Sequence, residues 1–288
     1  MPNLLLADLN YLSHRAFYTT GSLSYEGQGT GVAFGVLRTL EDVADLFGID
    51  ITVIACDSRT SLRKDILPSY KSSRWENMTE EDKEKRKDFE KQIRRLKTEI
   101  LPLAGYRNIF EVDGYEADDI IAKVAEDVES PSTALILSAD QDLWQCLRQG
   151  VDAYNPTSKK LMTASSFKDE WKLDPLQWRM VKCLAGCKTD DIPNIPGIGE
   201  KSAAAYLTGA LKSGVKYEKI TANLQLVKQN MPLVKLPYPG LSLPAVVADE
   251  VTLQSKRDAQ ELIGVRSART SERQRDAVRK KEIEGFDW

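Results

Sequence analysis

Residues 48–57 read "GIDITVIACD", an apolar run that is rich in β-branched residues and ends in an aspartate. Two other runs have the same form, "NLLLAD" at 3–8 and "STALILSAD" at 132–140. Such runs are typical of strands that are buried on both faces of a parallel sheet. Between the first two runs, residues 31–47 carry apolar side chains at helical spacing. The alternation of strands and helices predicts an α/β fold.

Four acidic residues lie at or just past the ends of these predicted strands: Asp8, Asp57, Asp140 and Asp142. In open α/β sheets, ligands bind beyond the carboxyl ends of the strands. We therefore expect the fold to bring together acids that are far apart in the sequence.

A further acidic segment, "EVDGYEADDII" at 111–121, places Glu116, Asp118 and Asp119 at the start of an expected helix. Buried carboxylates without partners are costly and tend to remain protonated. A hard cation such as Mg²⁺ prefers oxygen ligands, and two such ions about 3.5–4 Å apart promote phosphodiester cleavage. Any one of these acids alone is better explained as a helix cap or a solvated group. The whole set at strand ends favours a metal site.

The composition excludes several classes of protein. The chain has 288 residues, 42% of them hydrophobic, which is enough for a substantial core, and a net charge of −3. No apolar run of about 18 residues predicts a membrane span, and "MPNLLLADLN" lacks the basic start of a signal peptide. Four cysteines without a CxxC pair and a single histidine, His14, argue against zinc and against a disulfide scaffold. We expect an intracellular protein in which His14 packs or is exposed.

Residues 195–205, "IPGIGEKSAAA", combine a tight turn with a helix start. Gly197 and Gly199 let the backbone approach a ligand, and Lys201 and Ser202 follow where the free N–H groups of a helix N-terminus bind phosphate. With a helix before it, the segment has the form of a helix-hairpin-helix, which holds the DNA backbone without reading sequence. The alternative is an ordinary structural corner between two helices.

Residues 59–74, "RTSLRKDILPSYKSSR", carry five basic side chains and one acid. Lys71 and Arg74 are spaced to share a helix face, with Tyr70 beside them. A basic strip with an aromatic ring suits a nucleic-acid single strand, although a solvated surface strip is an equal alternative.

The order and spacing of three motifs resemble the flap endonuclease / 5′→3′ exonuclease family, which includes phage 5′ nucleases and the 5′ nuclease domain of bacterial DNA polymerase I. These motifs are "EADD" at 116–119, "SADQD" at 138–142 and "DDIPNIPGIGEKSA" at 190–203. "PSYKSSR" at 68–74 and "LADLNYLSHR" at 6–15 also resemble family motifs. The resemblance covers roughly residues 3–240.

The resemblance implies a PIN-like, mostly parallel sheet with flanking helices, a helical arch and a helix-hairpin-helix. The expected divisions are an α/β nuclease domain at 1–180 with an arch at about 58–105, a helical DNA-binding region at 181–263 and a charged tail at 264–288. The terminal "EGFDW" is a candidate docking segment for a replication protein.

Site residues are implied in the same way. Two divalent ions, Mg²⁺ or Mn²⁺, would be held by Asp8, Asp57, Glu116, Asp118, Asp119, Asp140, Asp142 and Asp190. Lys71 and Arg74 would hold the scissile phosphate, Tyr70 would stack a base, and Arg15 would contact the 5′ end. Phosphates of the duplex would be gripped by Lys182, Gly197, Gly199, Lys201 and Ser202, and family hairpins often bind K⁺ as well.

Two positions depart from the family pattern. Cys187 replaces an aspartate of the second metal site, and a thiol is a poor ligand for Mg²⁺. Leu9 follows Asp8 where glycine is usual. Asp191, where the family usually has asparagine, is a candidate to compensate for Cys187.

The sequence therefore predicts a monomeric, metal-dependent, structure-specific 5′ nuclease of replication or repair. Its expected substrate is DNA with a 5′ flap or end, with RNA–DNA hybrids as an additional one. The alternatives are a non-catalytic binder of DNA junctions and a PIN-like ribonuclease.

Overall fold

The computed structural model describes residues 3–75 and 78–265. Six strands in this part of the chain form one sheet in the order β5-β4-β1-β6-β7-β8. Neighbouring strands are parallel, except that β7 and β8 are antiparallel. The strands are β1 (Asn3–Asp8), β4 (Ile51–Cys56), β5 (Asn108–Glu111), β6 (Thr133–Leu137), β7 (Val151–Asn155) and β8 (Lys160–Met162). The three runs predicted to be buried parallel strands are thus the three central strands, as expected.

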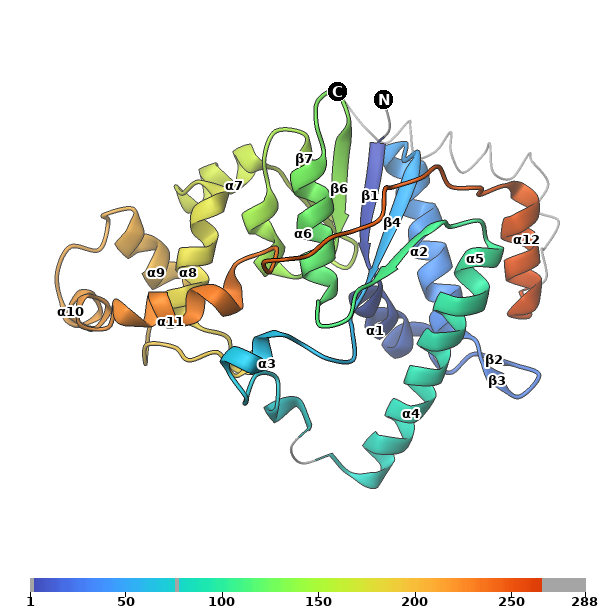
Figure 1. Ribbon diagram of the computed structural model, residues 1–288, viewed down its shortest axis with the longest axis horizontal. Helices are drawn as coiled ribbons and strands as arrows, with labels where there is room; N and C mark the ends of the chain where they lie inside the picture. Colours follow the sequence, from blue (N-terminus) through green and yellow to red (C-terminus); the bar gives the residue numbers. More distant parts are fainter. Residues whose placement is uncertain (1–2, 76–77, 266–288) are drawn as a thin grey trace.

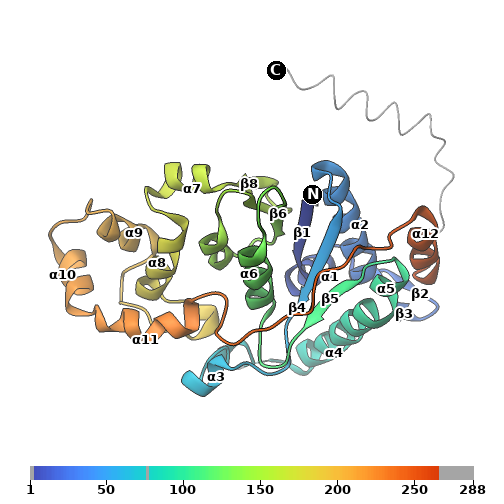
Figure 2. The same cartoon turned by 45° about the horizontal axis from the view of Figure 1, so that its top comes forward.

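Helices cover both faces of this sheet (Figure 1, Figure 2). On one face lie α1 (Leu9–Thr20) and α2 (Gly31–Phe47), and on the other α6 (Ala117–Asp127), α7 (Ala164–Trp171) and α8 (Trp178–Ala185). Alternate side chains of β1 enter the two cores, Leu5 on the side of α1 and Leu6 on the side of α6. Because both faces are covered, these strands are apolar throughout rather than alternating.

The long insertion after β4 returns to the sheet through helices. It contains α3 (Arg63–Ile66), a 3₁₀ turn (Ser73–Trp75), α4 (Glu80–Arg95), a π-helical turn (Leu96–Ile100) and α5 (Leu101–Leu103). Thr79 caps α4, because its hydroxyl accepts a hydrogen bond from the Asp82 N–H at 3.2 Å. Within the arch expected at about 58–105, the long exposed helix is α4, whose projection from the sheet edge is visible in Figure 1.

A second group of helices follows α8 at the opposite end of the molecule (Figure 1). It comprises a 3₁₀ turn (Lys188–Asp190), α9 (Glu200–Leu207), α10 (Val215–Ala222) and α11 (Gln225–Val234). Ile198, Ala203 and Ile220 belong to the same apolar core as the sheet face under α6. The helical character expected from residue 181 onward holds as far as α11, while the division at residue 180 stays a prediction.

An extended segment, residues 236–252, then runs back along the sheet edge to α12 (Leu253–Leu262), as both ribbon views show. We call it the strap. Asn108 of the edge strand β5 donates to the Val247 carbonyl at 2.9 Å and accepts from the Val247 N–H at 2.8 Å. Both bonds use the Asn108 side-chain amide, so the strap covers this edge of the sheet without adding a strand to it.

The remaining described elements are short: the hairpin β2 (Ser24–Tyr25) and β3 (Gln28–Gly29), and 3₁₀ turns at Gln141–Cys146 and Pro175–Gln177. No described helix has the length and apolar character needed to cross a membrane. The "EGFDW" segment lies outside the described residues.

Candidate active site

The predicted acids converge at the carboxyl edge of the central strands. β1, β4 and β6 lie side by side, so Asp8, Asp57 and Asp140 follow from neighbouring strand ends. Asp118 stands in the first turn of α6, and Asp142 in the 3₁₀ turn after β6. We call these five residues, Asp8, Asp57, Asp118, Asp140 and Asp142, the acidic cluster.

Hydrogen bonds orient the two carboxylates at the strand ends. Asp8 accepts from the Tyr11 N–H at 2.9 Å and from the Ser138 hydroxyl at 3.1 Å. Asp57 accepts from the Ala117 N–H at 2.8 Å and from the Asn10 side-chain amide at 2.6 Å. Asp57 thereby ties the end of β4 to the start of α6.

The acidic cluster is electrostatically unfavourable as it stands. Burial, followed by the charge of Asp57, raises the pKa of Asp8 from 3.8 to about 7. Burial and the nearby Asp140 raise the pKa of Asp142 to about 6, and burial with Asp140 and Asp8 raises the pKa of Asp118 well above its usual range. These acids accordingly favour a cation that would restore their ionised forms.

The donor chemistry of the acidic cluster fits a hard divalent cation, because all five side chains offer carboxylate oxygens. Within residues 3–75 and 78–265, no three histidine, cysteine, aspartate or glutamate side chains already stand in a geometry that could hold a metal ion.

Glu116 differs from the acidic cluster because it has cationic partners. Its Oε2 accepts from the Lys71 ammonium at 2.8 Å and from the Tyr70 hydroxyl at 3.1 Å. Burial alone would raise the pKa of Glu116, but Lys71 and Arg63 lower it below its ordinary value. Glu116 is thus ionised and paired with cations.

The structure corrects the expectation for Asp119. Its side chain is fully buried and forms a two-pronged ion pair with Arg63, at 2.7 and 2.8 Å. Its oxygens also accept from the backbone N–H groups of Glu116, at 3.1 Å, and Tyr238, at 2.8 Å. Four N–H groups already donate to the Asp119 carboxylate. Asp119 therefore supports the site from beneath instead of bridging two ions.

Tyr70 is a second correction. Only 2% of its surface is exposed, and it packs with Cys183, Ile192 and Leu233. A buried ring has no free face on which a base could stack, so the role of Tyr70 is to orient Glu116.

Lys182 is a third correction. Its ammonium lies 2.9 Å from Asp142 Oδ1 and 2.9 Å from Glu200 Oε1, and its side chain is 11% exposed. Lys182 therefore neutralises the edge of the acidic cluster and links it to α9 instead of reaching outward to a duplex.

Asp190 and its neighbours face the 3₁₀ turn that carries Arg74. The Arg74 guanidinium lies 2.5 Å from Asp190 Oδ1 and donates to the Thr189 carbonyl at 3.0 Å. Asp191 accepts from the Ser73 N–H at 2.9 Å, so it fixes this turn instead of compensating for Cys187.

Arg15 does not line the hollow next to the acidic cluster. Its guanidinium donates to the Thr39 hydroxyl of α2 at 3.1 Å. The preceding residue, His14, does line that hollow and packs against Phe89, with ring centroids 4.3 Å apart. The expected contact of Arg15 with a 5′ end is therefore not supported by its position.

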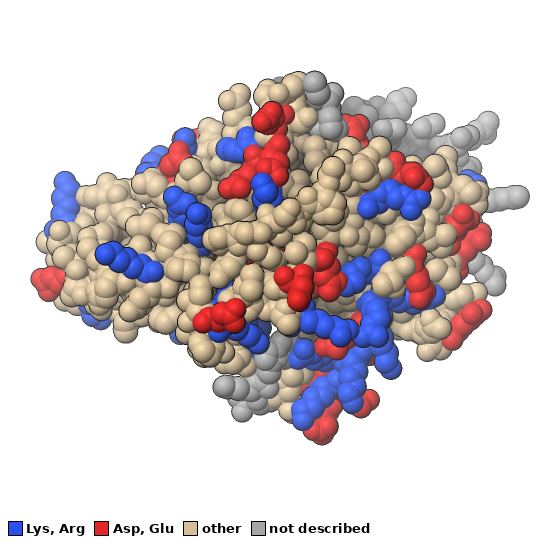
Figure 3. All heavy atoms as spheres, viewed as in Figure 1, with Lys and Arg blue, Asp and Glu red and all other residues tan. Residues whose placement is uncertain are grey.

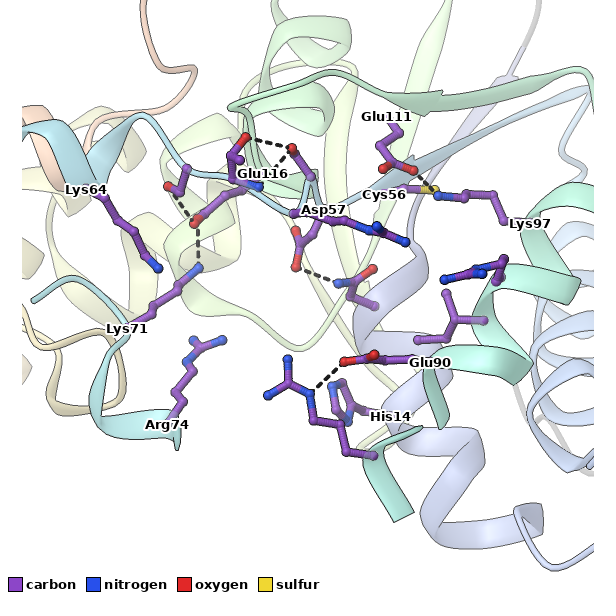
Figure 4. Close-up of a pocket in the computed structure, with 18 of the residues that line it drawn as sticks. His14, Cys56, Asp57, Lys64, Lys71, Arg74, Glu90, Lys97, Glu111 and Glu116 are labelled. Carbon is purple, nitrogen blue, oxygen red and sulfur yellow. Dashed lines mark hydrogen bonds and ion pairs between the residues drawn. The ribbon is translucent and has the colours of Figure 1, made fainter. Parts of the chain in front are cut away.

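A large cavity of about 720 Å³ opens beside these residues, between α1, α3 and α4 (Figure 4). Asp57 and Glu116 lie on one wall, and Lys71 and Arg74 on another. Arg59 and Lys64 of the predicted basic strip also line the cavity, whereas sequence reasoning missed three further basic lining residues: Arg86, Arg94 and Lys97. A signal was available for Arg86 and Lys97, since eleven residues are close to three helical turns and place both on one helix face.

The glycine turn has the predicted form. Gly197 has φ +81°, a conformation that favours glycine, and Gly199 precedes the first residue of α9. Lys216 of α10 donates to the Ser202 hydroxyl at 3.0 Å, and Lys219 donates to the Pro196 carbonyl at 3.2 Å. Lys201 is exposed at the start of α9. The turn and three lysines thus share one surface.

Residues 3–172 match the family model described as the 5′-3′ exonuclease, N-terminal resolvase-like domain. The chain belongs to this family. Its relatives include the thermostable DNA polymerase I of Thermus aquaticus, which is 29% identical over 246 residues. The matched region covers 81% of this chain and 28% of the polymerase. DNA polymerase I of Mycobacterium tuberculosis is 29% identical over 255 residues, 82% of this chain and 27% of the polymerase. The chain thus spans little more than a quarter of the length of these curated relatives.

Solved structures confirm the expected fold of this 5′-3′ exonuclease family member. The T5 5′-exonuclease with bound zinc matches with a TM-score of 0.70 and 22% identity, over 91% of this chain and 99% of that one. Human GEN1 in complex with Holliday junction DNA matches with a TM-score of 0.56 and 15% identity, over 91% of this chain and 68% of that one.

Proposed function

We propose that the protein is a divalent-metal-dependent, structure-specific 5′ nuclease that hydrolyses phosphodiester bonds of DNA carrying a 5′ flap or a free 5′ end. The observation that carries this proposal is the acidic cluster beside a cationic cavity of about 720 Å³. The carboxylates of the acidic cluster can hold metal ions, and the cations of the cavity can hold phosphate groups. The two together therefore suit hydrolysis of a phosphodiester bond.

The acidic cluster divides between two ions in this proposal. Asp8, Asp57 and Asp118 would hold the first ion, and Asp140 and Asp142 the second. When bound, the ions supply an activated water and neutralise charge on the phosphate. Glu116 and Asp190 are already paired with Lys71 and Arg74, so they would join only if those cations moved to the phosphate. Cys187 leaves the second site one carboxylate short of the family pattern.

Lys71 and Arg74 are the groups that would receive the scissile phosphate. The Lys71 ammonium lies 2.8 Å from Glu116, and Arg74 lies 2.5 Å from Asp190, so both are pre-placed on the cavity wall. On substrate binding they would exchange a carboxylate partner for a phosphate oxygen and stabilise charge that develops there.

The glycine turn would hold the duplex next to the cleaved strand. Gly197 and Gly199 expose backbone N–H groups, and Lys201 and Ser202 add side-chain donors. The carbonyls of the same turn are the place for the K⁺ expected from the family. Duplex DNA is favoured as the ligand because relatives named DNA polymerase I share this region, and the GEN1 neighbour was solved with junction DNA.

The decisive experiment is cleavage of a 5′-labelled flap DNA with Mg²⁺, with Mn²⁺ and with EDTA. Cleavage near the junction that needs a metal ion is expected. Asp118→Asn should lower kcat about a hundredfold or more, because it removes a central carboxylate of the acidic cluster. Asp152→Asn is the matched control, since the pKa of Asp152 on β7 is raised by burial alone and no cluster member contributes. Equal loss of activity in both variants would contradict the proposal.

A non-catalytic binder of DNA junctions is the second candidate, and Cys187 is the observation that favours it. Its Sγ lies 3.1 Å from the Thr189 hydroxyl, where a metal ligand is expected in the family. This function predicts tight binding of flap DNA without turnover in either metal, and restoration of cleavage by Cys187→Asp.

A further inference from the structure

A second hollow, of about 300 Å³, lies on the outer flank of α4. It is lined by Gln28 of the β2-β3 hairpin and by Lys91, Arg94, Arg95, Thr98 and Glu99. We call it the outer groove. Arg94 lines both the outer groove and the large cavity, so the two hollows meet at this side chain.

The geometry of α4 explains this continuity. Arg86, Glu90 and Lys97 share the helix face that borders the cavity, while Lys91 and Thr98 share the neighbouring face that borders the outer groove. At about 100° per residue, Arg94 lies between these two faces. One helix therefore presents a basic surface that turns the corner from the cavity to the outside of the molecule.

Part of this surface carries charge with no neutralising partner. Lys91 and Arg94 form no ion pair with any described residue, whereas Arg95 lies 3.4 Å from Glu99 and donates to the Leu262 carbonyl at 3.2 Å. Figure 3 shows Lys and Arg side chains gathered around α4. Unpaired cations along a groove attract a polyanion, and the effect weakens as salt rises.

We propose that the outer groove binds the single strand of DNA that has passed through the cavity, and so holds the 5′ flap beyond the cleavage site. This inference rests on the proposed 5′ nuclease function and adds a substrate-binding surface to it. Lys91 and Arg94 contact phosphates, and Gln28 and Thr98 supply neutral hydrogen-bonding groups. The lining has no aromatic ring, so binding depends on the backbone of the strand and not on its bases.

The test compares two 5′-flap DNAs that differ only in flap length. Single-strand sites commonly cover about 4–16 nucleotides, so a flap of about 2 nucleotides ends inside the cavity, while one of about 15 nucleotides reaches the outer groove. Lys91→Glu should raise Kd and KM for the long flap about threefold to tenfold more than for the short flap, and reduce the salt slope of long-flap binding by about one.

Lys85→Glu is the matched control, because it makes the same charge change on α4 at an exposed position that lines neither hollow. It should affect both flaps alike and weakly. Equal effects of Lys91→Glu and Lys85→Glu on Kd and KM for the long flap would contradict the proposal that the outer groove binds the flap. Binding is also measured in EDTA, where no cleavage occurs. Absence of cleavage by the unaltered protein with metal would contradict the proposed nuclease function. The comparison of flap lengths in EDTA would still test whether the outer groove binds the flap.

Discussion

At the scale of single residues, the site is governed by how each carboxylate is compensated. Glu116 and Asp119 face cations, at 2.8 Å from Lys71 and 2.7 Å from Arg63. Within the acidic cluster, Asp142 alone forms an ion pair with a described residue, Lys182. The same residue type thus has two roles within one short segment, one as a supporting ion-pair partner and one as a candidate metal ligand. Titration and mutation distinguish these roles.

The first prediction concerns the pH dependence of stability in the metal-free protein. The pKa of Asp8 is raised in the folded state from 3.8 to about 7, so the folded state binds more protons than the unfolded state between these values. The free energy of unfolding should therefore be highest at acidic pH and fall as pH rises through about 7. Denaturant unfolding in EDTA between about pH 5 and about pH 8 measures this decline.

Asp8→Asn is the control for that measurement, since it removes the titrating group and should flatten the decline. Added Mg²⁺ should raise Tm more at the higher pH, where the acids ionise most readily. A free energy of unfolding that rises across this interval in EDTA would contradict the raised pKa of Asp8.

The second prediction concerns Arg63, which is 2% exposed and also donates to the Leu233 carbonyl at 2.9 Å. Arg63→Ala leaves the charge of Asp119 buried without its partner, so we expect a loss of about 3–5 kcal/mol in the free energy of unfolding. Arg38→Ala is the control, because Arg38 and Asp42 form an exposed pair, 69% and 71% accessible. That pair should contribute about 1 kcal/mol or less. Comparable losses in the two variants would show that Arg63 does not support the site.

At the scale of elements, two helix starts carry most of the proposed chemistry. The start of α6 places Asp118 in the acidic cluster and Asp119 beneath it, because consecutive helical residues point about 100° apart. The start of α9 presents N–H groups after a glycine turn whose conformation only a few residue types adopt. Backbone geometry at these two points therefore determines where ligands can bind.

The third prediction tests the glycine turn. Gly197 has φ +81°, and an added Cβ would meet only the end of the Lys219 side chain, at 3.8 Å, so the cost of a substitution comes from the backbone and not from a clash. Gly197→Ala should lower the free energy of unfolding by about 1–2 kcal/mol. Gly197→Asn should cost less, since asparagine adopts this conformation more readily. Thermal or denaturant unfolding of the two variants tests this prediction. Equal losses in the free energy of unfolding would argue against backbone strain at residue 197.

At the scale of the whole molecule, the strap links the helices at one end of the molecule to the edge of the sheet at the other end. It leaves α11 near the acidic cluster, where the Tyr238 N–H donates to Asp119, and reaches the far edge of the sheet, where α12 packs against α5. The strap therefore connects the floor of the site to the element that ends the arch helices. Loosening it should affect the fold before it affects chemistry.

The fourth prediction concerns the anchor of the strap, Asp249. Its carboxylate accepts from the Thr52 N–H near the start of β4 at 2.6 Å and from the Arg107 N–H just before the edge strand β5 at 2.9 Å. Asp249→Ala should lower the free energy of unfolding by about 1–3 kcal/mol, because these N–H groups lose their acceptor. The adjacent Glu250→Ala is the control, because the Glu250 side chain is 67% exposed and pairs with Arg107 at the surface. This change should leave stability nearly unaltered. A larger effect of Glu250→Ala would contradict the anchoring role.

Much of this molecule could be predicted before its structure was examined. The three central strands and α2 follow from their hydrophobic patterns, which depend on neighbours in the sequence. The exposed helix of the insertion follows from the length of that segment and its continuous charge. The convergence of Asp8, Asp57, Asp140 and Asp142 follows from parallel topology, because parallel strands end at one edge of a sheet. The family follows from the order of its motifs.

Other features were settled only by the tertiary structure. The short edge strands β5 and β8 carry weak local signals and exist because the neighbouring strands β4 and β7 pair with them. The roles of Tyr70, Lys182 and Asp119 depend on which way each side chain points, and residues distant in the sequence set that direction. Arg63 had no distinguishing motif, yet burial between α6 and α11 makes it the central cation beneath the site. Sequence by itself thus determined the elements and the family through short-range periodicity and motif order, whereas the partner of each buried charge was decided by packing, since burial makes an unpaired charge too costly to leave.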